Sequence, residues 1–338
     1  MKRKTLLISI AIVFQIGVVA TMVASREWLL ATGTPYLFQT APVDPRDIFR
    51  GDYVRLDYLF NSVPLSQLGE AILKNGLRKG DKVYLSLTTD NGNVSRGGKL
   101  HASPPQGPYL RGYVTAHWPY RHQRKMDAEE WRKAIVDAWP VQVKYGIEQY
   151  FVQQGSGREM EEMRGSRNGF QVPLLIHAAV SKSGEAAIRS YEWANIAVKT
   201  EIAHSPKRNA PDEKASAVMQ LWVKNRGDKT VNLPLMADNC SFALIPNSHA
   251  PQDALNFATP RDCTDKAVKM VSLQPGESHA ITFDLNRPRW WVVFKNKPTP
   301  PGKLPWQYRY RIQYQGEHID GLNAAILSRA FHGQGNLD

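Results

Sequence analysis

An uncharged run near the amino end constrains this chain more than any other feature of its sequence. Residues 5–25 include no charged side chain and are mostly Leu, Ile, Val, Ala, Phe and Met. As a helix these 21 residues would extend about 30 Å, enough to cross the hydrocarbon core of a bilayer. Arg26 and Glu27 end the run. The sequence therefore predicts one N-terminal transmembrane helix that contacts membrane lipid through residues 5–25.

The charges around this run predict the orientation of the chain. Lys2, Arg3 and Lys4 precede it, so the positive-inside rule places the N-terminus in the cytoplasm. We expect a single-pass protein of the inner (cytoplasmic) membrane with its body in the periplasm or at the cell exterior, because no later stretch is long and apolar enough to span. The alternative is a cleaved signal peptide, but residues 18–20 match a cleavage site only weakly and the apolar run continues past them.

The cysteine content agrees with export. Cys240 and Cys263 are the only two cysteines, and an oxidising compartment would let them form a disulfide. A bridge of this span would stabilise the fold by about 3 kcal/mol through loop closure. The alternative is a pair of buried free thiols. Two cysteines also exclude a disulfide-dense scaffold and a multi-cysteine zinc module.

The net charge of +12 includes a basic stretch with interleaved aromatic residues at residues 118–133. Outside the cytoplasm nucleic acid is not an expected partner. Such a surface would instead contact anionic lipid headgroups or acidic envelope polymers. The alternative is an ordinary solvated face.

The patterning of the body predicts a mainly β fold with short helices. Residues 1–27 form the anchor, followed by a small β-rich, barrel-like domain at 28–200 and a polar linker at 201–214. An immunoglobulin-like β-sandwich follows at 215–320, because short alternating strands and turns dominate there. Residues 321–338 are expected to form a loose C-terminal tail. Strands are expected at residues 53–60, 82–88, 109–116, 141–145, 172–180, 186–192, 218–224, 230–235, 242–245, 268–273, 280–285 and 306–314, and helices at 66–77, 127–138 and 158–164.

One octet carries a family resemblance. It reads Gly51, Asp52, Tyr53, Val54, Arg55, Leu56, Asp57, Tyr58. This resembles the Gly-Asp-Tyr-x-x-Leu-x-Tyr motif of the GDYXXLXY family of bacterial membrane-anchored proteins of uncharacterised function. The flanking residues 42–47, 145–152, 157–161 and 186–189 are also similar to family blocks, so the resemblance covers about residues 1–195. It implies an exported, anchored domain without an established activity. Because some members are encoded beside or fused to multi-pass membrane proteins, it also implies a membrane-protein partner.

Charged residues crowd around this octet and form the candidate polar site. They are Asp44, Arg46, Asp47, Arg50, Asp52, Arg55 and Asp57. These carboxylates and guanidinium groups could bind a ligand or perform acid–base chemistry at the mouth of a small barrel. The other interpretation, which we favour, is a structural turn in which Asp44 and Asp47 cap backbone N–H groups and the arginines neutralise the carboxylates. Alternation further predicts that Val54, Leu56, Tyr58 and Phe60 share one buried face.

Other catalytic patterns are weak. The nine histidines form no His-x-His or His-Glu-x-x-His pattern, so no metal or cofactor is expected. No nucleophile-elbow or Walker-type loop is present. A Ser62/Lys82 dyad can be imagined, but no spacing fixes the two together. We therefore expect a non-enzymatic binding or assembly module for a membrane-protein partner. The alternative is an envelope hydrolase that uses carboxylates near Asp44–Asp57.

Overall fold

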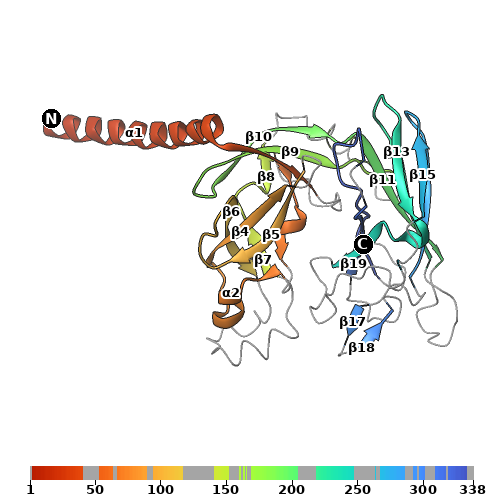
Figure 1. The fold of residues 1–338 in the computed structure, drawn as a ribbon. Helices are drawn as coiled ribbons and strands as arrows, with labels where there is room; N and C mark the ends of the chain where they lie inside the picture. Colours follow the sequence, from red (N-terminus) through yellow and green to blue (C-terminus); the bar gives the residue numbers. More distant parts are fainter. Residues whose placement is uncertain are drawn as a thin grey trace.

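A computed structural model describes most of the anchor and of the β-rich body (Figure 1). The described residues are 2–40, 53–63, 67–89, 94–116, 141–151, 160, 163, 165, 169–204, 218–246, 263, 267–285, 292–294, 297–300, 309–316 and 319–332. Within them the fold is mostly β, with few helices and several antiparallel sheets, as predicted.

The N-terminal helix is longer than the predicted anchor. Helix α1 (Lys2–Thr32) continues beyond residue 27 because Trp, Leu, Leu, Ala and Thr follow without a helix breaker. Within its stretch Leu7–Thr32, an 18-residue window has a mean hydropathy of 2.4, and the rest of the described chain buries none of that window. The helix projects away from the body in Figure 1. It is therefore long and apolar enough to cross a membrane.

The helix ends at a close contact with the body. Gly33 donates its backbone N–H to the carbonyl of Leu29 at 2.9 Å. A Cβ atom at Gly33 would lie 2.9 Å from that of Ala179, so only glycine permits this approach. Arg189 donates a hydrogen bond to the Gly33 carbonyl at 3.0 Å. These contacts fix the helix end against the adjacent sheet.

The first unit of the body encloses one core between two main sheets. One sheet has the order β3 (Ser62–Val63), β7 (Val141–Lys144), β6 (Tyr109–Ala116), β4 (Lys82–Thr89), β5 (Ser95–His101). The other consists of β1 (Thr34–Gln39), β9 (Leu174–Val180) and β10 (Ala186–Trp193). The short pair β2 (Tyr53–Arg55) and β8 (Gln149–Phe151), helix α2 (Glu70–Asn75) and the 3-10 helix η2 (Leu59–Asn61) complete this unit.

The sequence prediction of a barrel-like domain was wrong in its closure. The described strands form no closed barrel. Buried residues of the five-stranded sheet, such as Leu85, share a core with Phe38 and Ile176 of the other sheet. Since the second sheet covers this core, it is enclosed without one sheet having to curl onto itself.

The second unit is built from two layers of antiparallel strands. One layer contains β11 (Ile196–His204), β12 (Val218–Asn225) and β16 (Ser278–Asp284). The other contains β13 (Val231–Met236) with β15 (Val268–Leu273), and β14 (Phe242–Pro246) with β19 (Arg309–Tyr314) and β20 (Phe331–His332). Phe242 packs edge-to-face on Phe283 across the layers at 5.2 Å. The hairpin β17 (Val292–Phe294) and β18 (Lys297–Thr299) completes the described strands.

Two predicted segments differ from the structure. The expected linker at 201–214 begins inside β11, which pairs along its length with β12; residues 205–214 lie outside the described part. The expected loose tail at 321–338 was wrong for residues 321–332. Phe331 is fully buried and pairs with Tyr310, and Ile326 also enters the second core. This burial depends on contacts with β19, so no local pattern revealed it.

The segment 319–332 also joins the two units, and Figure 1 shows the C-terminal part of the chain between them. Gln39 of β1 exchanges two hydrogen bonds with the backbone of Ala325, at 2.9 and 2.7 Å. Asn195 accepts a hydrogen bond from the backbone N–H of Asn323 at 3.2 Å, and its own backbone N–H donates to the Asn323 side chain at 2.9 Å. We call residues 319–332 the clasp, because they connect the strand after the helix to the second core.

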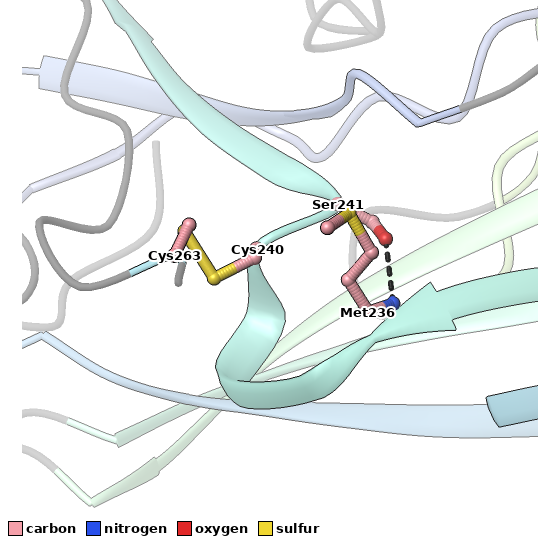
Figure 2. Close-up of a disulfide and its surroundings, with 4 residues drawn as sticks. All are labelled: Met236, Cys240, Ser241 and Cys263. Atoms are coloured by element: carbon pink, nitrogen blue, oxygen red, sulfur yellow. Dashed lines mark hydrogen bonds between the residues drawn. A yellow bond between two sulfur atoms is a disulfide. The ribbon is translucent and has the colours of Figure 1, made fainter. Parts of the chain in front are cut away.

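Cys240 and Cys263 lie at disulfide-bonding distance, as predicted, with their Cα atoms 5.6 Å apart (Figure 2). Cys240 follows the 3-10 helix η5 (Ala237–Asn239), beyond the end of β13. The neighbouring Ser241 accepts a hydrogen bond from the backbone N–H of Met236 at 2.8 Å. The bridge and this bond hold the corner between β13 and β14.

Candidate functional site: the junction of helix and body

Leu56 and Tyr58 of the motif lie in the core of the first unit. Val54, Leu56, Tyr58 and Phe60 are all buried, which confirms the predicted face. The rings of Tyr58 and Phe60 stack with their centroids 5.0 Å apart. Phe38 of β1 meets both rings edge-to-face, at 6.2 and 5.2 Å. The last positions of the motif therefore pack the strand after the helix against the body.

A polar network then connects the motif to residues 145–148. The Tyr58 hydroxyl donates to the carbonyl of Ile147 at 2.9 Å. The side-chain oxygen of Asn61 accepts the Tyr58 backbone N–H at 2.7 Å. The Asn61 amide nitrogen donates to the Val143 carbonyl at 2.9 Å and to Glu148 at 3.1 Å. Since each of these buried groups has a partner, the network fixes the position of the 145–148 turn.

Glu148 is the acceptor at the centre of this turn. Its carboxylate accepts the backbone N–H of Tyr145 at 2.6 Å and that of Gly146 at 3.0 Å. Gly146 has a φ of 86°, a conformation that favours glycine. The Leu56 N–H donates to the Glu148 carbonyl at 2.9 Å. The motif and the 145–152 block, which are far apart in the sequence, thus form one structural unit.

The two tyrosines of this unit stay protonated at neutral pH. Burial, and then the nearby Glu148 carboxylate, raise the pKa of Tyr58 above its ordinary value of 10.0. The same two causes raise the pKa of Tyr145 well above 10.0. The Tyr145 hydroxyl donates to the Phe60 carbonyl at 3.1 Å. Both hydroxyl groups therefore act as structural donors.

A groove of about 690 Å³ separates helix α1 from this end of the body. The helix contributes one stripe to it at helical spacing: Met22, Ser25, Arg26 and Leu29. The body contributes β6, the 145–148 turn and the start of β10. The lining residues on the body are Arg111, Tyr113, Lys144, Tyr145, Gly146, Glu148, Glu185 and Ala186. The helix wall combines apolar Met22 and Leu29 with polar Ser25 and Arg26, whereas the body wall is mostly polar and includes the motif-linked turn.

Some charged groups of the groove have their bonding partners within the body, and others do not. Arg111 forms an ion pair with Glu185, and the Glu148 carboxylate is occupied by the three N–H donors described above. Arg26 donates one hydrogen bond to the Ala186 carbonyl at 3.2 Å. Lys144 is exposed, and no described residue neutralises its ammonium group. Two cations therefore retain free capacity where the helix meets the body.

Most of the predicted polar site cannot be placed. Asp44, Arg46, Asp47, Arg50, Gly51 and Asp52 lie outside the described residues, as do the basic stretch at 118–133 and the helix expected at 127–138. The backbone of Tyr53 and Arg55 lies in β2, paired with β8. Whether the charged cluster is a site or a turn stays a prediction, and so does the hydrolase alternative that depends on it.

The imagined Ser62/Lys82 dyad was wrong. Ser62 lies in β3 and Lys82 in β4, with β7 and β6 between these two strands in the sheet. At about 4.8 Å per strand, the two backbones are about 14 Å apart. The Ser62 hydroxyl accepts a hydrogen bond from Gln142 at 2.5 Å. Within the part of the chain that the structure describes, no three His, Cys, Asp or Glu residues gather as metal ligands.

Sequence reasoning missed most residues of the junction. Asn61 and Lys144 were not singled out, and Glu148 appeared only as part of a family-like block. The first charge after the apolar run, Arg26, was noted only as the end of the span. The sequence did hold one usable indication, because the 145–152 block resembled the family together with the octet.

The fold and the junction define a class: a β-rich body in which a buried tyrosine motif packs on the strand that follows an apolar N-terminal helix. The family model of the GDYXXLXY protein matches residues 15–190, about half of the chain, and the chain belongs to this family. The match includes most of the helix, the motif and the two sheets of the first unit, and it ends within β10. Comparison with curated protein sequences and with solved structures gives no match.

Proposed function

We propose that this protein is a non-enzymatic, single-pass module of the cell envelope that binds a membrane-protein partner. Its N-terminus lies in the cytoplasm, its helix remains uncleaved in the inner membrane, and its body lies on the opposite side. The observation that carries the proposal is the exposed apolar surface of α1. The body buries most of its described large apolar side chains, with exceptions such as Phe151, Val268 and Met270, whereas such side chains are exposed along most of the helix, where Phe14 is 70% exposed and Trp28 is 71% exposed.

This apolar surface requires a cover from outside the chain. Apolar side chains are exposed around the helix, including Leu7, Ile8, Ile10, Ile12, Val13, Phe14, Ile16, Val18, Val19, Met22 and Val23. A helix that is apolar on all sides is typical of a membrane span. Lipid can cover part of it and a partner helix the rest, since helices in membranes associate by packing.

The docking of the helix supports a role in assembly. Gly33, Arg189 and Arg26 connect the helix end to the first unit, so a partner bound to the helix also meets the body at a defined position. The family motif stabilises this same end. A flexible tether would need none of these contacts.

Site-specific photocrosslinking in living cells tests the proposal. A crosslinker would replace Ile12, Ile16 or Val19 on one helix face and Ile10 or Phe14 on the opposite face, with the exposed Met270 of β15 as the control position. We expect one membrane protein to be crosslinked from one helix face only, since a partner helix covers a single side. Equal crosslinking to lipid from both faces would contradict the partner, and a mature N-terminus after residue 20 would contradict the anchor.

A further inference from the structure

The groove between α1 and the body lies where the helix would leave the bilayer. This inference rests on the membrane anchor proposed above. The uncharged residues 5–25 match the roughly 30 Å of the hydrocarbon core. The following turns, up to Thr32, therefore cross the headgroup layer. Exposed Trp28 lies in these turns, and tryptophan is enriched at this level of membrane proteins.

The groove offers contacts for both parts of a phospholipid. Met22 on the helix stripe offers apolar contact beside the acyl region, and Leu29 offers it at the headgroup level. Arg26, one turn from each of these residues, and Lys144 of β7 present cations at the headgroup level. Both carboxylates of the groove are occupied, Glu148 by three N–H donors and Glu185 by Arg111. Glu148 keeps its negative charge, because its three donors are neutral, but the cations Arg26, Arg111 and Lys144 outnumber the two carboxylates by three to two, so the groove has a net charge of +1.

We propose that this groove binds one anionic phospholipid from the leaflet that faces the body. Arg26 and Lys144 hold the phosphate, and the acyl chains extend from there along the Met22 side of the helix into the hydrocarbon core. Among the described residues Arg26 donates one hydrogen bond, to Ala186, and its guanidinium group carries five N–H donors. A zwitterionic lipid is a poorer ligand because its own cation meets these positive groups.

Native mass spectrometry of the full-length protein in detergent tests the lipid site. The protein is incubated with equal amounts of phosphatidylglycerol and phosphatidylcholine, and the lipid retained on each chain is counted. We expect one preferred phosphatidylglycerol per chain. Lys144→Gln and Arg26→Gln should each lower the ratio of phosphatidylglycerol to phosphatidylcholine by about fivefold. Lys229→Gln, which removes the same charge from an exposed turn of the second unit, should leave the ratio unchanged.

The outcomes separate this proposal from the anchor. Equal retention of both lipids by the wild-type protein, or the same ratio in Lys144→Gln, would overturn the lipid site while leaving the anchor intact. Displacement of the retained lipid by excess inorganic phosphate alone would indicate a simple anion site and would also overturn the proposal. Recovery of the wild-type protein in the soluble fraction of cells would instead contradict the anchor itself. The variants should fractionate with membranes as the wild type does.

Discussion

The two units of the body hold their strands in different ways. In the first unit several strands are very short, and side chains such as Tyr58, Asn61 and Glu148 connect them through buried hydrogen bonds. In the second unit the central strands β11 and β12 run for nine and eight residues, and β12 buries every second side chain. The first unit thus fixes a particular shape beside the helix, whereas the second relies on regular pairing. The difference indicates that part of the family motif is architectural and serves the end of the body that meets the helix.

Of the changes considered, removal of the clasp should produce the largest difference in stability between the two units. Ending the chain before residue 319 removes Ile326, Leu327 and Phe331, all fully buried in the intact fold. At about 1.5–3 kcal/mol each, their loss is comparable to the whole stability of a typical domain. We expect β12, β14 and β19 to lose protection in hydrogen-exchange mass spectrometry of the truncated protein in detergent, compared with the intact protein, while β4 and β6 retain it. Equal loss in both units would show that they fold as one.

Loss of the disulfide should affect the second unit alone. Replacing Cys240 and Cys263 with Ser should lower the free energy of unfolding of this unit by about 3 kcal/mol, because the unfolded chain regains the freedom of the closed loop. Chemical denaturation followed by region-resolved exchange measures the change. Reductant should reproduce it in the wild type and have no effect on the double variant. A comparable change in the stability of the first unit would contradict the claim that the disulfide acts on the second unit alone.

One pair of substitutions compares the two units with the same chemistry. Tyr58→Phe removes the hydrogen bond from the Tyr58 hydroxyl to the Ile147 carbonyl in the first unit. Tyr314→Phe removes the hydrogen bond to the Pro234 carbonyl in the second unit. We expect a loss of about 1–3 kcal/mol for each, larger for the more deeply buried Tyr58. Denaturant titration measures both, and Tyr84→Phe, on a half-buried ring, should change stability little. The reverse order would show that the Tyr58 network is not the stronger constraint.

Alkaline pH should weaken the first unit through Tyr145. Because burial and Glu148 raise its pKa in the folded state, the folded protein keeps the proton above pH 10 while the unfolded chain releases it. This contribution to the free energy of unfolding is complete below pH 10 and is lost as the pH rises. The loss is about 1.4 kcal/mol at pH 11. Tyr145→Phe should remove this part of the slope in stability measured against pH. An identical slope in wild type and variant would contradict the role of Tyr145.

Local patterns made much of the fold predictable. Strand β15 was predicted at its observed bounds, and β12 and β16 within two residues, because alternation of apolar residues is visible in any short window. Helix α1 was predicted from apolar length alone. Strand β1 and the clasp were missed, since their burial depends on partners far away in the chain. Their sequences carry no sustained alternation of their own.

The candidate site was less predictable than the fold. The burial of Leu56 and Tyr58 followed from alternation, but the bond between Asn61 and Glu148 joins residues 87 positions apart. No spacing rule identifies such a pair. The groove additionally depends on the angle at which the helix meets the body, which Gly33 and its neighbours set. Residue types alone therefore could not place Arg26 and Lys144 at the same groove.

The clasp has a consequence for how the protein is made. Gln39 and Ala325, which bond to each other, are 286 residues apart in the chain. At ordinary rates of translation, β1 is synthesised on the order of tens of seconds before this partner exists. During that interval the contact between β1 and the clasp is still missing from the nascent body. Chaperones that act on nascent chains would bind at this incomplete contact. A protein fused at the carboxyl terminus would follow closely after the segment that completes it.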